Sequence, residues 1–327
     1  MCNVIAERIS NNQLISRLPV VTLALKNDLF KDYSSEHLFA RLNNYSLNFT
    51  TNLFYRLETL RQQWGDDIIS EIISDKLAAG KSNYSVDAFR QVVSEIEIIT
   101  YFPRILQNFI NDLSYEPTFN GNRNPEIEFV FDNNRYQIEV KSPTFNYCDE
   151  IADGDAFINY RVTPERFEEI KTQYEKYHFP KDNKFKDFLE SAQGKFSSEC
   201  ADMNSNVYGI LVINWDNFVV PNIDSTFDNL DSIFYNSVSG IFTNNSFIKD
   251  NNGNPEIFDR VNGILIYQRT IGMYGADDMF ADYRLYKKYY IQNPYTKNSP
   301  EDFVKRILLA KIIKSKASYD DITILDI

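Results

Sequence analysis

The sequence predicts an α/β fold in which helices pack on a mixed β-sheet. Apolar residues recur at the helical period through residues 13–113, and the period changes to two between residues 126 and 140. A third observation is the apolar, β-branched run at 207–213, which is typical of a buried strand. Strands that alternate with helices along the chain indicate an α/β sheet.

The first part of the chain is expected to be helical. Residues 13–77 show helical spacing, and the polar stretch 79–83 interrupts it. The next helix is expected over 85–113, with Ser85 as its N-cap, and Pro103 is expected to kink or split it. We therefore expect a helical N-terminal region at 1–84, followed by a core at 85–270.

The elements that follow alternate between strand and helix. A short strand is expected at 115–119, before a hairpin, and a helix at 184–196. A final helix is expected over 301–316, because the Ser-Pro-Glu-Asp sequence at its start supplies a cap, an N1 proline and two acids. The remaining strands are expected at 207–213 and 263–267. Residues 271–327 would form a basic, tyrosine-rich C-terminal segment, an α/β extension packed on the core.

The change to a period of two predicts a β-hairpin. With a two-residue turn at Asn133-Asn134, Glu128 would face Glu139, and Glu126 would face Lys141. One face of the hairpin would then be wholly apolar. The other face would carry the polar residues Glu126, Glu128, Gln137, Glu139 and Lys141.

This polar face has the composition of a metal site. Cross-strand spacing would place its three carboxylates and one ammonium within about 5–8 Å of one another. Mg²⁺ binds through one or two carboxylates and leaves room for water and phosphate. Lys141 would then position the attacking water, hold a phosphate oxygen or help the water to ionise. The simpler alternative is a hairpin whose charged face is solvated.

Two short motifs resemble the PD-(D/E)xK nuclease superfamily, the restriction-endonuclease-like enzymes. They are Asn-Pro-Glu-Ile-Glu-Phe at 124–129 and Ile-Glu-Val-Lys at 138–141. The resemblance covers about residues 85–216 and implies an αβββαβ core. It also implies that Glu126 and Glu139 bind the metal with the Val140 carbonyl, and that Lys141 is catalytic. Glutamate stands at position 126 where aspartate is usual, and Glu128 remains an alternative ligand.

Further implications follow from the same resemblance. A glutamate on the helix before the sheet is matched by Glu95, and a polar residue on the later helix by Gln193; Lys195 is expected on an exposed face. The implied cofactor is Mg²⁺, with Mn²⁺ as a substitute. The implied substrate is nucleic acid, DNA rather than RNA, cut by an endonuclease of the restriction or phage-defence type. A homodimer or a defence-system partner protein would accompany such a role.

Composition and charge limit which functions and cellular locations are expected. The net charge of −12 opposes nucleic-acid binding, but residues 283–316 carry nine Lys or Arg against two Asp or Glu. With only His37 and His178, zinc sites and histidine-based nucleases are disfavoured. The three cysteines lack metal-ligand spacing, and no apolar stretch reaches membrane length. We expect a soluble cytoplasmic protein with no membrane partner.

Two other functions remain open at this point. A nuclease-like module that has lost cleavage would bind nucleic acid or act as a scaffold. Its support is the glutamate at position 126 and the acidic net charge. A protein-interaction role is the second alternative, with a hairpin that is merely polar on its outer face.

Overall fold

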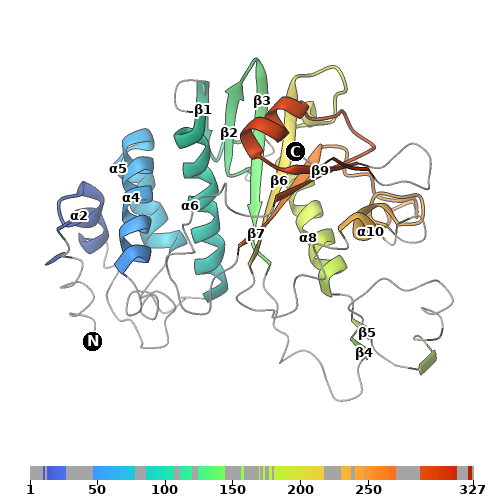
Figure 1. Ribbon diagram of the computed structural model, residues 1–327, viewed down its shortest axis with the longest axis horizontal. Helices are drawn as coiled ribbons and strands as arrows, with labels where there is room; N and C mark the ends of the chain where they lie inside the picture. Colours follow the sequence, from blue (N-terminus) through green and yellow to red (C-terminus); the bar gives the residue numbers. More distant parts are fainter. Residues whose placement is uncertain are drawn as a thin grey trace.

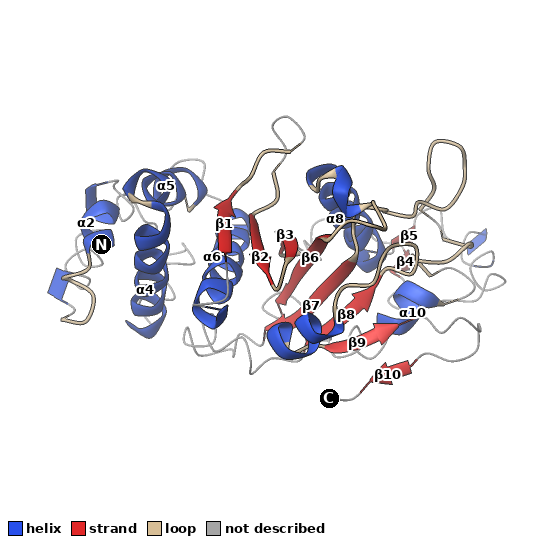
Figure 2. Cartoon of the chain, turned by 90° about the horizontal axis from the view of Figure 1, so that it is seen from above, coloured by secondary structure: helices blue, strands red, loops and turns tan. Residues whose placement is uncertain are grey.

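The protein has an α/β fold built on one mixed sheet, with helices on both faces (Figures 1 and 2). The structure is a computed structural model. It describes residues 10–11, 13–26, 47–77, 86–106, 111–119, 124–143, 156–157, 169, 172–173, 177–178, 180–216, 230–236, 240–246, 248–269, 288–314 and 323–325.

The main sheet has eight strands in the order β1-β2-β3-β6-β7-β8-β9-β10. Strands β1, β2 and β3 are antiparallel neighbours, and β3, β6 and β7 run parallel. Strand β8 is antiparallel to β7 and parallel to β9, and β10 is antiparallel to β9. The strands are β1 Asn111–Tyr115, β2 Ile127–Phe131, β3 Asn134–Lys141, β6 Val207–Asp216, β7 Gly263–Arg269, β8 Lys288–Gln292, β9 Lys311–Lys314 and β10 Thr323–Leu325. A separate pair joins β4 Ala156–Phe157 to β5 Tyr177–His178.

Helices from the first third of the chain cover one face of the sheet. Helix α6 lies against the sheet, and α4 and α2 continue outward from it (Figure 2). Their side chains share a core with sheet residues such as Ile138 and Val212. These elements are α2 Pro19–Lys26, α4 Leu47–Trp64, α5 Asp66–Glu71, a π-helix at Ile72–Lys76 and α6 Val86–Leu106.

Helix α8 covers the opposite face. It spans Pro180–Lys195, and a short 3₁₀ turn at Ser198–Cys200 follows it. A second core forms between α8, α10 (Leu230–Tyr235) and sheet residues such as Leu211. The two faces therefore have separate cores, as the alternation of side chains along β6 requires.

Most of the predicted elements are confirmed, with shifted ends. The helix at 184–196 and the strands at 207–213 and 263–267 are present as α8, β6 and β7. Helix α6 continues through Pro103 but ends at Leu106, so the proline does not split it. The strand expected at 115–119 lies earlier, at Asn111–Tyr115. Ser85, the expected cap, lies outside the described residues.

The hairpin turn lies at Asp132-Asn133, so the predicted turn at Asn133-Asn134 is wrong. Asp132 and Asn133 have φ values of 49° and 59°, as a two-residue type I′ turn requires. Glu128 consequently pairs with Gln137. The predicted cross-strand pairs are displaced by two residues. Because side chains alternate with a period of two, this shift leaves every side chain on its predicted face.

The final predicted helix is wrong beyond Leu308. A π-helix spans Phe303–Leu308, and Leu309 adopts a left-handed conformation with φ 50° and ψ 43°. Strand β9 then begins at Lys311 and runs beside β8. Its β-branched Ile312 and Ile313 enter the two different cores, so packing on both faces of the sheet outweighs the helical spacing.

The basic C-terminal stretch does not present a continuous charged surface among its described residues. Lys288 is only 5% exposed. The Lys297 ammonium donates to the carbonyls of Glu199 and Asp202, at 3.2 and 2.8 Å. Tyr290 is buried, and residues 283–287 lie outside the described part. Lys288 and Lys297 therefore serve packing as well as charge.

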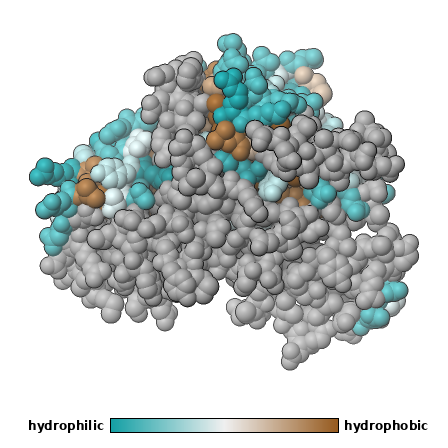
Figure 3. All heavy atoms as spheres, in the orientation of Figure 1, coloured by the Kyte–Doolittle hydropathy of each residue, from teal (hydrophilic) through white to brown (hydrophobic). Residues whose placement is uncertain are grey.

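The described residues show few apolar side chains in the view of Figure 3. Where residues are described, hydrophilic side chains dominate this face, and apolar ones form small separate groups. Among the helices that the structure describes, none combines the length and the apolar character that a membrane crossing requires.

Candidate metal centre

The polar face of the hairpin is buried beneath α8. Gln137 and Glu139 have no exposed surface, and Glu126 is 6% exposed. Glu139 lies beside Leu211 of β6, whose side chain packs against α8. The alternative of a solvated charged face is therefore wrong for this hairpin. Buried carboxylates need partners, because desolvation penalises an unpaired charge heavily.

Glu126 and Glu139 lie close together at the end of the hairpin. The Glu126 amide donates to the Ile138 carbonyl at 2.9 Å, which continues the β2–β3 ladder by one residue. The Lys195 ammonium lies 3.6 Å from Glu126 Oε1 and 2.7 Å from Glu139 Oε1. The two oxygens cannot be farther apart than the sum of these distances. That sum is below the roughly 7 Å within which rotamer changes could let both reach one metal ion.

Three more charged groups complete this end. Lys141 Nζ is 2.7 Å from Glu139 Oε1. Lys76 Nζ, at the end of the π-helix, lies 3.9 Å from Glu95 Oε2 and 3.8 Å from Glu126 Oε2. We call these side chains the carboxylate–lysine cluster: Glu95, Glu126, Glu139, Lys76, Lys141 and Lys195.

Burial dominates the electrostatics of the cluster. It raises the pKa of Glu126 well above the ordinary value, and the nearby Glu95 and Glu139 carboxylates raise it further. Lys76 and Lys195 offset only part of this rise. Burial also raises the pKa of Glu95. Burial lowers the pKa of Lys195, but its two carboxylate partners outweigh that effect and raise it overall. Glu126 is therefore a site where a proton or a cation is favoured.

The oxygen atoms suit a hard divalent cation, although lysines occupy the space between them. Glu126 Oε2 and Glu139 Oε1 are buried and accept no hydrogen bond. Both do lie near ammonium groups, at distances typical of ion pairs. As placed, no group of three His, Cys, Asp or Glu side chains among the described residues is arranged to hold a metal. The donor set fits one cation between Glu126 and Glu139, where Lys195 now lies.

Gln91 links the Val140 carbonyl to the cluster. Gln91 Nε2 donates to the Val140 carbonyl and to Glu95 Oε1, both at 2.8 Å. Its Oε1 accepts from the Ser142 amide at 2.6 Å. One side chain from α6 therefore fixes the end of β3 and orients Glu95. The Val140 carbonyl, a ligand implied by the family resemblance, lies at the edge of the cluster.

Two predicted site residues lie elsewhere. Glu128 Oε2 accepts from Gln137 Nε2 at 2.8 Å, and no lysine of the cluster contacts it among the described interactions. Of the two glutamates, Glu126 lies in the cluster and Glu128 lies outside it. Gln193 donates to Asp259 and accepts from the Arg260 amide at 3.0 Å, so it turns away. Lys195 reaches the cluster instead, because residues two apart on a helix do not share a side.

Sequence reasoning missed Lys76 and Gln91 and assigned Lys195 to an exposed face. A signal for Lys76 was present, because it continues the apolar stripe of Ile69, Ile72 and Ile73 at helical spacing. A lysine at a buried position of a helix needs an acidic partner. Lys195 likewise lies three residues after the buried Ala192.

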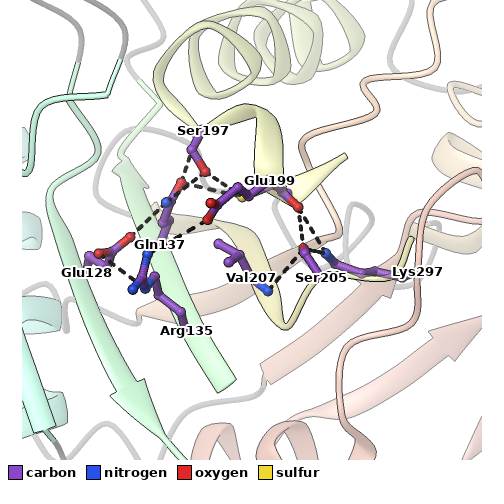
Figure 4. A network of polar contacts seen from close by, with 9 residues as sticks. Glu128, Arg135, Gln137, Ser197, Glu199, Ser205, Val207 and Lys297 are labelled. Atoms are coloured by element: carbon purple, nitrogen blue, oxygen red, sulfur yellow. Dashed lines mark hydrogen bonds and ion pairs between the residues drawn. The ribbon is translucent and has the colours of Figure 1, made fainter. Parts of the chain in front are cut away.

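The other end of the same hairpin face is a hydrogen-bond network centred on the neutral side chain of Gln137 (Figure 4). Gln137 Nε2 donates to Glu128 and to Ser197 Oγ, at 2.8 and 3.0 Å. Gln137 Oε1 accepts from the Ser197 amide at 2.9 Å. Burial raises the pKa of the adjacent Cys200 to about 12, so its thiol stays protonated. This end clamps the hairpin to the segment after α8 and offers no activated group.

Comparison of the chain with family models, with curated proteins and with solved structures found no match in any of the three.

Proposed function

We propose that this protein is a metal-dependent nuclease that hydrolyses phosphodiester bonds in DNA. The observation that carries the proposal is the burial of Glu126 and Glu139 side by side, with Lys141 on the same strand end. Hard oxygen donors beside a lysine suit this reaction better than a purely structural role.

The order of elements supports the same proposal. Helix α6, strands β1, β2 and β3, helix α8 and strand β6 follow one another in the order of the αβββαβ core of the PD-(D/E)xK superfamily, with the β4–β5 pair inserted before α8. Glu126, just before β2, and Glu139, in β3, are the residues that match the motif, and Glu95 comes from the preceding helix. By analogy with that superfamily, we propose a cytoplasmic restriction or phage-defence role, either as a homodimer or with a partner protein.

Five residues of the cluster have a distinct part in this proposal. Mg²⁺ or Mn²⁺, when bound, would supply Lewis acidity and lower the pKa of a water molecule. Glu126 and Glu139 would hold the ion, and Glu95 would hold Glu126 in place. The Lys141 ammonium would orient the attacking water and stabilise the hydroxide that forms when the proton leaves to solvent. Lys195 would contact a phosphate oxygen once it is displaced from Glu139.

The test is a cleavage assay with matched variants. Supercoiled plasmid, linear duplex and RNA are incubated with the protein in Mg²⁺ or in Mn²⁺. Glu139→Ala and Lys141→Ala are compared with Lys186→Ala, which removes a lysine that pairs only with Glu190 on the exposed side of α8 among the described ion pairs. We expect metal-dependent DNA cleavage that is lost in the first two variants and kept in the third. Cleavage that survives both cluster variants would rule the proposed site out.

A second function has its own supporting observation. Lys76, Lys141 and Lys195 already balance the three carboxylates, so the cluster can persist without a metal. A nuclease-like module that binds nucleic acid without cutting it would have this property. DNA binding without cleavage in either metal, unchanged by Glu139→Ala, would favour this second function.

A further inference from the structure

Lys76 reaches the cluster from outside the predicted nuclease core. It ends the π-helix Ile72–Lys76, in which the Leu77 amide donates to the Ile72 carbonyl at 2.8 Å. The wider π turn is anchored by the buried Ile72 and Ile73. Such turns are rare and occur often at functional sites. The N-terminal helices thus contribute a charged group to the site and do not merely pack beside it.

The acidic partners of Lys76 come from three different segments. Glu95 lies on α6, Glu116 follows β1, and Glu126 precedes β2. The Lys76 ammonium makes ion pairs with all three carboxylates and lies 5.1 Å from the centre of the Tyr115 ring. A side chain with so many anionic contacts, only 24% exposed, is held as a fixed cation.

Glu126 is shared between two cationic positions. Its Oε1 faces Lys195, on the side of Glu139, and its Oε2 faces Lys76, on the side of Glu95. Two-metal nuclease sites place their ions about 3.5–4 Å apart on a shared carboxylate. Here both positions hold an ammonium, but among the described ion pairs Lys195 contacts two carboxylates, whereas Lys76 on the Glu95 side contacts three.

We infer that Lys76 is a resident cation that takes the place of a divalent ion between Glu95 and Glu126. The proposed nuclease would then bind a single metal ion, on the Glu126–Glu139 side. That ion is part of the proposed function, on which this inference rests. A divalent ion on the Glu95 side would have to expel Lys76, because both cations would use Glu126 Oε2. Lys76 is accordingly a positioning residue, which fixes Glu95 and Glu126 for the metal.

The experiment counts bound metal and needs no enzymatic activity. Metal-free protein is titrated with Mn²⁺ by calorimetry, and the number of bound ions is compared for the wild type, Lys76→Met and Lys76→Arg. Lys186→Met serves as the control for loss of an exposed lysine. We expect Lys76→Met to bind one more Mn²⁺ per chain than the wild type. We expect Lys76→Arg and Lys186→Met to match the wild type.

The outcomes separate this inference from the proposed function. A wild-type count of one supports the metal centre, and a count of zero contradicts it. The difference between Lys76→Met and the wild type decides the role of Lys76 in either case. Equal counts in Lys76→Met and the wild type would overturn the inference, as would two ions in the wild type.

A second variant guards against loss of the fold. If circular dichroism shows that Lys76→Met is unfolded, the double variant Lys76→Met/Glu116→Gln removes one acid along with the ammonium. It keeps Glu95 and Glu126, so the same additional Mn²⁺ is expected. A folded double variant that binds no more Mn²⁺ than the wild type would equally overturn the inference.

Discussion

The two ends of one hairpin face differ in what surrounds their carboxylates. At one end, Glu128 accepts a hydrogen bond from Gln137, and Gln137 is held by Ser197 (Figure 4). At the other end, Glu126 and Glu139 have ammonium groups as neighbours, and an oxygen of each accepts no hydrogen bond. Both ends lie beneath α8 and the segment that follows it.

The difference separates a structural polar network from a candidate site. Neutral partners with good geometry satisfy buried polar groups and fix a single arrangement. Ammonium groups balance charge, and a divalent cation that displaced Lys195 would find the oxygens of Glu126 and Glu139 as ligands. Carboxylates at the two ends of one strand pair can therefore serve different purposes, stability at one end and chemistry at the other. Substitutions at each end should consequently affect different measurements.

The largest expected effect is on catalysis, from Lys141→Met. Under the proposed function, loss of its ammonium should lower the rate of DNA cleavage by about 10²- to 10⁴-fold. Stability should change little, because Glu139 keeps its ion pair with Lys195. Initial rates of plasmid cleavage and thermal unfolding measure the two effects. An unchanged rate would show that Lys141 has no part in the reaction.

The next largest effect is on stability, from Gln137→Leu at the opposite end. Leucine removes the hydrogen bonds that join Gln137 to Glu128 and to the Ser197 amide, while Glu128 keeps its ion pair with Arg135. The free energy of unfolding should fall by about 2–4 kcal/mol, since the half-buried Glu128 and the buried Ser197 amide lose hydrogen bonds. Denaturant titration measures this loss, and cleavage by the folded fraction should stay near the wild-type rate. An unchanged denaturation midpoint would contradict the structural role of the network.

Glu126→Gln should stabilise the protein when metal is absent. Burial and neighbouring carboxylates raise the pKa of Glu126 above its ordinary value of 4.5. A raised folded pKa gives stability that is present below 4.5 and is lost as the pH rises through the folded pKa. Glutamine stays neutral, so the variant should be more stable than the wild type at neutral pH, and the advantage should vanish below pH 4.5.

Chemical denaturation in EDTA at neutral and acidic pH measures this gain. Glu128→Gln is the matched variant at the other end, where Gln137 and Arg135 offset part of the burial that raises the pKa of Glu128. Its gain should be smaller than that of Glu126→Gln. A larger gain at position 128 would reverse the comparison between the two ends.

The smallest effect is expected from Arg135→Gln. Its guanidinium lies 3.7 Å from Glu128 and 3.8 Å from Glu199, and its side chain is 46% exposed. Exposed ion pairs contribute little, so the free energy of unfolding should change by less than about 1 kcal/mol. A double-mutant cycle with Glu199→Gln measures the coupling. A coupling well above that value would show that the outer ion pairs help to hold the network.

Sequence patterns predicted much of the fold around the site. The period of two between residues 126 and 140 identified both hairpin faces, and β-branched runs located β6 and β7. The helix predicted from residue spacing was wrong at β9. There Ile312 and Ile313 pack into different cores, and this packing outweighs the helical spacing. The predicted turn was also wrong, because Asp132-Asn133 and Asn133-Asn134 are equally acceptable type I′ sequences.

The sequence alone determined that Glu126, Glu128, Glu139 and Lys141 share a face, because side-chain alternation does not change when the register shifts by two. Only the tertiary structure decided that Glu126 belongs to the cluster and Glu128 to the hydrogen-bond network. The tertiary structure also decided that Lys76 and Lys195, which are distant in the sequence, contact the carboxylates of the hairpin. The spacing of residues within one segment does not specify which helix end will pack beside which strand. Burial then sets the charge balance, and burial is a property of the assembled layers rather than of any one segment.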